Sequence, residues 1–248
     1  MQRRKTEAGG PMIIFNNVDM SFKDTVVMDK FCAEYEANKI NCILGPSGCG
    51  KTTLLNLISG IIMENGGQVT KPERVSYVFQ DESLIPQKTA RKNLEFALKS
   101  AYKDKAELSA AIDNLLELSG LGNASDLYPH EMSGGMRQRL ALIRAFGYPS
   151  DVLLMDEPFK ALDITLRDSI IKSFMNLYEN DKRTVIFVTH NIDEALLTGD
   201  YVFVYSKKPI NLQKRFIINK SRSGRKLYDD SLAGIKNEIL RETEKWQT

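Results

Sequence analysis

Residues 40–58 read INCILGPSGCGKTTLLNLI, and this stretch decides the fold of the chain. A compact apolar run, Ile40–Leu44, ends at a glycine, and apolar residues at helical spacing follow from Thr52 to Ile58. Between them, Gly45–Thr52 matches the phosphate-loop pattern at every fixed position. The stretch therefore predicts a strand, a phosphate-binding loop and a helix, in the order that such a loop requires.

The residue types of this loop indicate what it binds. Its glycines let backbone N–H groups curl around phosphates, Lys51 can reach the β- and γ-phosphates, and the Thr52 hydroxyl can hold Mg²⁺. We predict that the nucleotide is contacted by the whole loop and the residue after it: Gly45, Pro46, Ser47, Gly48, Cys49, Gly50, Lys51, Thr52 and Thr53.

Cys49 occupies a variable position of the loop and has two interpretations. It is a small residue that fits, or it is a thiol whose pKa is lowered by Lys51 and by the start of a helix. The second interpretation predicts that alkylation of Cys49 inactivates the protein and that Mg-ATP protects it.

Further apolar runs alternate with helical patterns along the chain. This alternation predicts an α/β fold with a mostly parallel sheet, and the helical stretch after residue 82 is long enough for a subdomain. The expected strands are Ile13–Phe15 and Val26–Met28 around a turn, then Ile40–Leu44, Val75–Phe79, Val152–Met155, Val185–Val188 and Val202–Tyr205. The expected helices lie at 52–58, 90–120, 136–146 and 227–246, with a helix start near Asn191.

Composition restricts the function classes. The 248 residues are 42% hydrophobic and 27% charged. The net charge of +2 is not the strongly basic balance that is typical of nucleic-acid-binding proteins. The three cysteines have no metal-ligand spacing and fit a reducing cytosol. No apolar run reaches the roughly 20 residues of a membrane-spanning helix. Residues 1–11 are polar and basic, which indicates a frayed tail and not a secretory signal.

Acidic residues end the run Val152–Met155. Asp156 is costly to bury unless a cation uses it, and Mg²⁺ bridging to the phosphates and Thr52 would be that cation. Glu157 is placed to polarise an attacking water as a general base. The alternative is a solvated acidic pair that opens a turn before Pro158.

Three other candidates flank predicted strands. His190 follows a strand at its carboxyl end, where it could donate to the γ-phosphate, or it only flanks a helix. Gln80 could ligate Mg²⁺ or position water through its amide oxygen, or it begins a loop. Phe22 could stack on adenine, or it is a core aromatic. His130 has weaker claims and is interpreted as a local surface residue.

Residues 133–138, SGGMRQ, form a second candidate phosphate-binding element. Two glycines bring backbone N–H groups close to an anion, and the helix that follows adds its positive N-terminal end. One nucleotide already has its phosphate loop, so this second element needs a separate explanation.

Together these residues resemble the ATP-binding-cassette (ABC) family, from about Met12 to Tyr205, with each motif in the expected order. Gly45–Thr52 resembles Walker A, Leu153–Glu157 resembles Walker B, and Ser133–Gln138 resembles the signature. Gln80 falls at the Q-loop, Ala161–Asp163 resembles the D-loop, and His190 resembles the switch histidine.

Tyr128–Arg139 and Leu153–Phe159 look more narrowly like the ATPase subunits of nitrate, sulfonate and taurine importers, as does Val188–Ala195. Lys160 replaces the glycine usual before the D-loop alanine, and Ser83–Gln87 lacks a tryptophan often found after its proline. Neither departure touches ATP chemistry, but both weaken the assignment to a substrate subgroup.

The resemblance implies a RecA-like core of P-loop NTPase type at about 12–82 and 147–215, a helical subdomain at about 83–146 and a helical tail at about 216–248. It implies ATP and Mg²⁺ as cofactors, with Lys51, Glu157 and His190 catalytic and Thr52, Gln80 and Asp156 around the metal. Two copies would pack head to tail, so that Ser133, Gly134, Gly135 and Gln138 of one copy complete the other's site and Asp163 lies in the D-loop.

The implied function is the ATPase subunit of an importer for a small solute, peripheral on the cytoplasmic face of the membrane. Its partners would be two permease subunits and, indirectly, an extracytoplasmic solute-binding protein, with no nucleic acid. A stand-alone ABC ATPase is the main alternative, but such proteins usually carry a coiled-coil insert or a second cassette, and neither is recognised in this sequence. A GTPase or kinase is disfavoured because it would lack the signature. An exporter is disfavoured by the single-cassette layout. The sequence does not identify the solute. In the charged tail, Arg222–Arg225 could contact a membrane surface or be solvated, and solvation is favoured.

Overall fold

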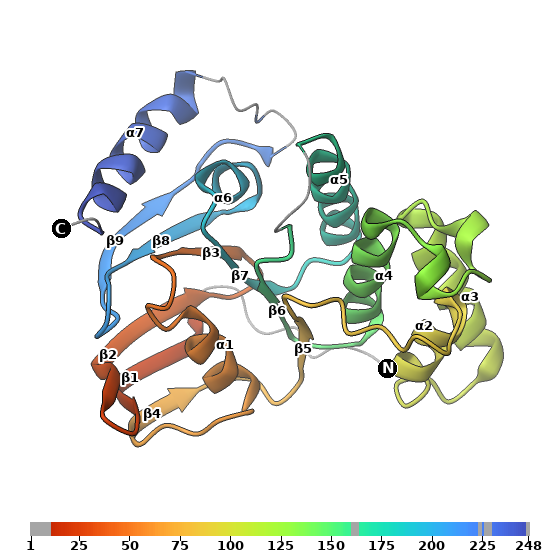
Figure 1. Cartoon of the computed structure of the whole chain (residues 1–248), viewed down its shortest axis with the longest axis horizontal. Coiled ribbons are helices and arrows are strands. Elements are labelled where there is room, and N and C mark those ends of the chain that lie inside the picture. The colour runs from red at the N-terminus through yellow and green to blue at the C-terminus, as the bar shows by residue number, and fades with distance from the viewer. Residues whose placement is uncertain (1–10, 160–163, 223–224, 226–229, 247–248) are drawn as a thin grey trace. The chain divides into compact units, whose positions relative to one another are not determined.

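The computed structural model describes residues 11–159, 164–222, 225 and 230–246 (Figure 1). The chain divides into two compact units, of which the first comprises residues 1–73 and 183–248 and the second residues 74–182. The subdomain boundaries predicted from the sequence stay predictions. Residues 1–10 of the expected tail, Lys160 and the D-loop residues Ala161–Asp163 lie outside the described residues.

Two groups of strands form the first unit. In one group, β1 (Pro11–Phe22) pairs antiparallel with both β2 (Thr25–Glu36) and β4 (Gly66–Thr70). In the other, β3 (Ile40–Leu44) pairs parallel with β7 (Thr184–Thr189) and β8 (Tyr201–Tyr205). The strand β9 (Leu212–Ile217) pairs antiparallel with β8. The helices of this unit are α1 (Lys51–Ser59), α6 (Ile192–Thr198) and α7 (Asp230–Glu244).

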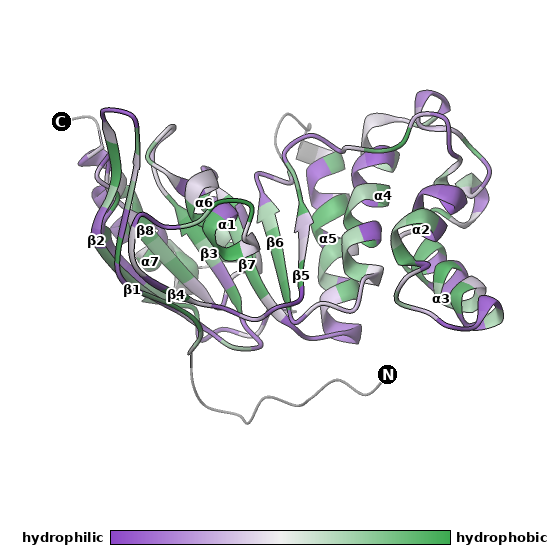
Figure 2. Cartoon of the chain, turned by 90° about the horizontal axis from the view of Figure 1, so that it is seen from below, coloured by the Kyte–Doolittle hydropathy of each residue, from purple (hydrophilic) through white to green (hydrophobic). Residues whose placement is uncertain are grey.

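Aromatic side chains join the two groups of strands in the first unit. Phe31 of β2 packs on Tyr205 of β8 with ring centroids 5.7 Å apart, and Tyr35 packs on Phe203 at 5.0 Å. The hydroxyls of Tyr35 and Tyr205 are hydrogen-bonded at 2.8 Å, which satisfies two polar groups inside the core. All of β3 and β7 is buried, as expected for parallel strands covered on both faces. Both strands are mostly hydrophobic, as their colouring in Figure 2 shows.

The second unit combines one parallel strand pair with four α-helices. The strands β5 (Val75–Val78) and β6 (Val152–Asp156) are parallel. The helices α2 (Ala90–Leu98) and α3 (Lys105–Leu118) pack against α4 (Gly134–Gly147), which also packs against α5 (Ile164–Asn180) (Figure 1). Two short 3₁₀ helices, η1 (Gly122–Ala124) and η2 (Pro129–Glu131), precede α4.

The predicted fold class is confirmed, with a mostly parallel sheet and antiparallel N-terminal strands. The bounds predicted for the strand Ile40–Leu44 are those observed for β3. In contrast, β1 and β2 are much longer than the short runs expected there. The expected elements do not include β4, β9 or α5. Five of the six residues of β9 are exposed, so this edge strand shows no apolar run in the sequence.

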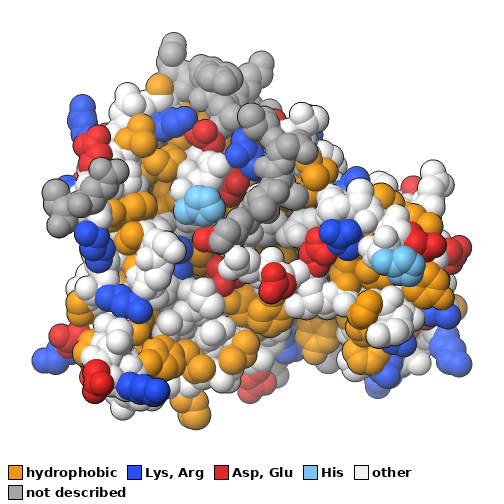
Figure 3. All heavy atoms as spheres, viewed as in Figure 1, with side chains coloured by type: hydrophobic (Ala, Val, Ile, Leu, Met, Phe, Trp, Pro, Cys, Tyr) orange, Lys and Arg blue, Asp and Glu red, His pale blue; other side chains and the backbone are white. Residues whose placement is uncertain are grey.

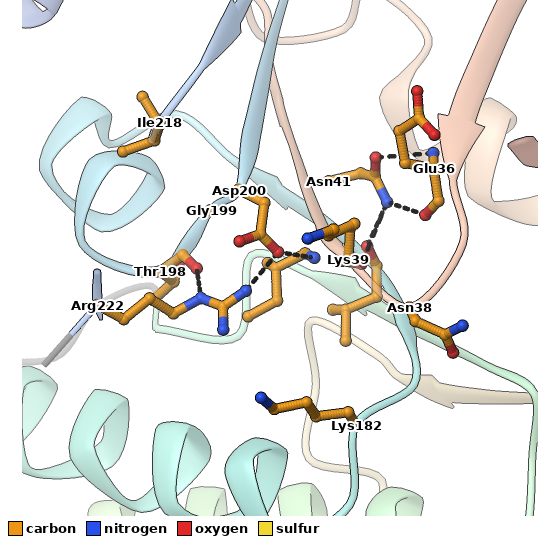
Figure 4. A network of polar contacts seen from close by, with 12 residues as sticks. Glu36, Asn38, Lys39, Asn41, Lys182, Thr198, Gly199, Asp200, Ile218 and Arg222 are labelled. Carbon is orange, nitrogen blue, oxygen red and sulfur yellow. Dashed lines mark hydrogen bonds and ion pairs between the residues drawn. The ribbon is translucent and has the colours of Figure 1, made fainter. Parts of the chain in front are cut away.

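The segment after β9 corrects an expectation. Solvation was favoured for Arg222–Arg225, but Arg225 is buried and its guanidinium donates to the carbonyls of Leu196, Gly199 and Ile218. Arg222 pairs with Asp200 and donates to the Thr198 carbonyl at 3.2 Å, while the Asp200 carboxylate also accepts from the Ile40 N–H (Figure 4). Both arginines therefore tie the tail to the turn between α6 and β8.

Within the part of the chain that the structure describes, no helix is both long enough and apolar enough to cross a membrane.

Candidate functional site

The phosphate loop connects β3 to α1 in the first unit, and glycine is required at two of its positions. Gly48 and Gly50 have φ angles of 73° and 122°, in the region that side chains with a Cβ rarely adopt. A Cβ on Gly50 would lie 2.6 Å from Val27 Cγ1, so close packing excludes it as well. These glycines hold the backbone in the curled form that a phosphate cradle needs.

Lys51 points back into this loop. Its side chain is buried, and Nζ donates to the carbonyl oxygens of Gly45 and Pro46, both at 2.8 Å. Thr52 is exposed at the first turn of α1. A buried ammonium beside a helix N-terminus is a suitable environment for an anion, so the loop fits the phosphates of a nucleotide.

The structure corrects the sharper interpretation of Cys49. The thiol is buried, and this burial raises its pKa, although the positive charge of Lys51 acts in the opposite direction. A Cβ on Gly45 would lie 2.9 Å from Cys49 Sγ, which shows how closely the sulfur packs under the loop. Cys49 is therefore a small buried residue that fits, and we no longer expect it to be a reactive thiol.

We expect alkylation of the native protein at pH 8 to modify Cys32 well before Cys49. Cys32 is exposed, whereas burial and a raised pKa leave little accessible thiolate at Cys49. Labelling with N-ethylmaleimide followed by peptide mass spectrometry measures both rates in one sample, and labelling in urea is the control for intrinsic reactivity. Equal rates for the two thiols in the native protein would contradict the packing described here.

Phe22 and His190 also belong to the first unit. Phe22 ends β1 with 46% of its surface exposed, so it is not the core aromatic of the alternative interpretation. His190 is exposed directly after β7, and the next residue, Asn191, caps α6 by accepting from the Asp193 and Glu194 N–H groups. Both side chains are exposed, and their predicted roles stay predictions.

Asp156 and Glu157 lie in the second unit, where β6 ends. Asp156 is the last residue of the strand and only 6% exposed. Its negative charge adds to the burial of Tyr77 on the neighbouring strand β5 in raising the pKa of that phenol. Glu157 has a φ of 46°, which is uncommon for a residue with a side chain and is typical of functional sites. The backbone therefore turns sharply between the two carboxylates.

Gln80 follows β5 in the same unit and is exposed. The residue before it, Phe79, stacks on Tyr77 with ring centroids 4.1 Å apart. Gln80 thus follows the strand that pairs with the one ending at Asp156.

The signature begins α4 with an exposed serine. Ser133 is the N-cap, and its Oγ accepts from the Met136 N–H at 3.3 Å. Gly135 is buried, and a Cβ there would lie 2.2 Å from Leu166 Cδ1 of α5. This glycine therefore also allows α4 and α5 to pack closely, a structural requirement that the sequence interpretation missed.

Gln138 requires a correction. Its side chain is buried and its Nε2 donates to the carbonyl of Pro158, which follows Asp156 and Glu157 in the same chain. We therefore remove Gln138 from the residues expected to face a second copy. Its contact holds the turn after β6 against α4.

Charge is dispersed over the face drawn in Figure 3, where Lys and Arg side chains alternate with Asp and Glu. His130 is exposed and stacks on Tyr128 at 5.7 Å, in agreement with a local surface role. The structure therefore places the predicted site residues in two sets. One set, with Phe22, Lys51 and His190, belongs to the first unit, and the other, with Gln80, Ser133 and Asp156, to the second.

Comparisons with known proteins agree with the family resemblance found in the sequence. Residues 29–160 match the family described as ABC transporter. The chain is 35% identical over 229 residues to the aliphatic sulfonates import ATP-binding protein of Bacillus cereus, which covers 88% of each chain. It is 40% identical over 181 residues to the taurine import ATP-binding protein of Rhizobium johnstonii, covering 70% of this chain and 69% of that one.

Among solved structures, the chain resembles the ATP-binding cassette MJ0796 in a dimeric, post-hydrolysis state bound to ADP and phosphate. The TM-score is 0.73 at 26% sequence identity, and the match covers 85% of this chain and all of the other.

Proposed function

The chain belongs to the ABC transporter family of ATPases, and on that premise we propose that it is the ATP-hydrolysing subunit of an importer. The solute would be small, of the nitrate, sulfonate and taurine class. The proposal rests first on the exposed start of α4, where Ser133 and Gly134 offer a second phosphate-binding element to another copy.

Within each copy, we infer the following roles. Gly45–Thr52 binds the phosphates through its backbone, Lys51 supplies the positive charge, and Phe22 stacks on the base. Thr52, Gln80 and Asp156 would hold Mg²⁺, which supplies charge neutralisation on the phosphates. Carboxylate, hydroxyl and amide oxygens are suitable donors for this hard cation, and Asp156 supplies a buried carboxylate.

Hydrolysis requires a proton acceptor for the attacking water. Glu157 is half-buried at a sharp turn directly after Asp156, the last residue of β6. We propose that Glu157 takes the proton and that His190 donates a hydrogen bond to the γ-phosphate. Ser133 and Gly135 of a second copy would contact the same phosphate, so two copies would form two sites.

One finding supports the importer assignment: relatives similar over most of their length are named as import ATP-binding proteins. A similar solved structure is dimeric, which supports a homodimer. We propose a homodimer that drives two separate permease subunits, at the cytoplasmic face of the membrane, with a solute-binding protein acting on the other side. A stand-alone ABC ATPase is the alternative.

The importer assignment is tested in cells that lack this chain. We expect them to lose uptake of radiolabelled taurine or an alkanesulfonate, and expect wild-type protein, but not Glu157→Gln, to restore it. Purified protein should also hydrolyse Mg-ATP with a specific activity that rises with protein concentration, because each site needs two copies. Unchanged uptake of every such solute, with intact ATPase activity, would favour the stand-alone alternative.

A further inference from the structure

We propose that Arg137 and Arg144 of α4 are positioning residues for Gln80, because they fasten the segment after Gln80 to the helix that begins at Ser133. The inference rests on the proposed function of Gln80 as a ligand of Mg²⁺. It assigns a role to two arginines that the phosphate-binding elements do not use.

The fastening consists of three contacts within the second unit, one from Arg137 and two from Arg144. Arg137 Nε lies 2.8 Å from Glu82 Oε2, and Arg137 Nη1 also donates to the Met132 carbonyl at 2.9 Å. Arg144 donates from Nη1 to the Ser83 carbonyl at 2.7 Å and from Nη2 to the Glu82 carbonyl at 3.0 Å. The two arginines therefore bind both the Glu82 side chain and the backbone of Glu82 and Ser83.

The helix geometry explains why both arginines reach one segment. Residues seven apart in an α-helix are separated by about two turns and lie on the same face. Arg137 also reaches the Met132 carbonyl, one residue before the N-cap Ser133. The same side chain thus contacts both Met132, the residue before the signature, and Glu82, two residues after Gln80.

Two further features support a defined conformation for this segment: the burial of Arg144 and the backbone conformation of Ser83. Arg144 is half-buried, and this burial lowers the pKa of its guanidinium, which makes two carbonyl contacts in exchange for part of its hydration. Ser83 has a φ of 48°, an uncommon backbone conformation for a residue with a side chain, and Arg144 holds its carbonyl.

The other end of the segment is held by α2. The buried Asn93 side chain accepts from the Ile85 N–H at 2.8 Å and donates to the carbonyls of Lys88 and Thr89. Before Gln80, Phe79 stacks on Tyr77 of β5. Gln80 and Asp81 are both exposed and lie between these two anchored parts. The backbone on either side of Gln80 is therefore anchored by β5 and by α4.

The test compares Arg137→Ala with Arg139→Ala. Arg139 is on the same helix, but its guanidinium bonds to the carbonyls of Gly135 and Ser119 instead. Hydrogen exchange of residues 79–85 in the nucleotide-free protein should become faster in Arg137→Ala than in the control. Equal exchange in both variants would overturn the fastening, whatever the activity of the protein.

The functional consequence is measured as the Mg²⁺ concentration for half-maximal ATPase activity. We expect Arg137→Ala to raise it about two- to fivefold, as for a partly exposed ion pair, with Gln80→Ala as the reference for complete loss of the amide. The double variant Glu82→Arg/Arg137→Glu should recover most of the change that each single variant causes. A glutamate at 137 lies in the first turn of α4, where the helix dipole favours it.

The outcomes separate the two hypotheses. A shift in Gln80→Ala but not in Arg137→Ala, or no recovery in the double variant, would overturn the positioning role alone. No shift in Gln80→Ala would overturn the metal-ligand role of Gln80, and with it the functional part of this inference, while the exchange measurement still decides whether the fastening exists.

Discussion

Glu157→Gln is expected to bind Mg-ATP, to lose about 10²–10⁴-fold in turnover and to accumulate as a dimer. The substitution keeps the size and the hydrogen-bonding oxygen of the side chain but removes its ability to accept a proton near neutral pH. Without hydrolysis, the ATP-bound pair of copies has no route to reopen. The dimer is measured by size-exclusion chromatography with light scattering, and turnover by phosphate release.

The structure indicates that this substitution should leave the local backbone unchanged. Glu157 has a φ of 46°, and glutamine tolerates this conformation no worse than glutamate, so the backbone turn after β6 should persist. Glu107→Gln is the matched control, because it removes an exposed carboxylate from α3 in the same unit. Wild-type turnover in Glu157→Gln would show that Glu157 is not the general base.

Ser133→Arg is expected to bind ATP normally at its own Lys51 while its turnover falls more than about 100-fold, the range for loss of oxyanion contacts. An arginine at the exposed start of α4 would block the approach of a second copy. It also removes the cap on the Met136 N–H, which costs about 1 kcal/mol. Ser133→Ala removes the same cap without the bulk and is therefore the control for helix stability.

Mixing variants tests directly whether the signature acts on the neighbour's nucleotide. In a mixed dimer of Ser133→Arg and Lys51→Ala, one of the two sites combines an intact Lys51 with an intact Ser133. An equal mixture of the two inactive proteins should therefore recover up to about a quarter of wild-type activity. No recovery, with mixed dimers shown to form, would mean that the signature does not complete a neighbour's site.

The sequence predicted most strands and the candidate residues because these depend on local rules. The apolar run Ile40–Leu44 predicted the bounds of β3. The fixed glycines predicted the curled conformation of the phosphate loop. The same rules could have found α5, where Ile170, Phe174 and Leu177 recur at helical spacing. The edge strand β9 could not be found in this way, because pairing with β8 and not apolar periodicity stabilises it.

By itself, the sequence predicted two elements that bind nucleotide phosphates, since both consist of short runs with glycine at fixed spacing. Tertiary structure alone decided what the neighbouring side chains do. Burial raises the pKa of Cys49, which the sequence placed beside a lysine. Close packing against Leu166 requires Gly135, and Arg137 contacts Glu82, 55 residues earlier in the chain. The physical reason is that desolvation, packing and ion pairing depend on residues distant in sequence, which no local pattern records.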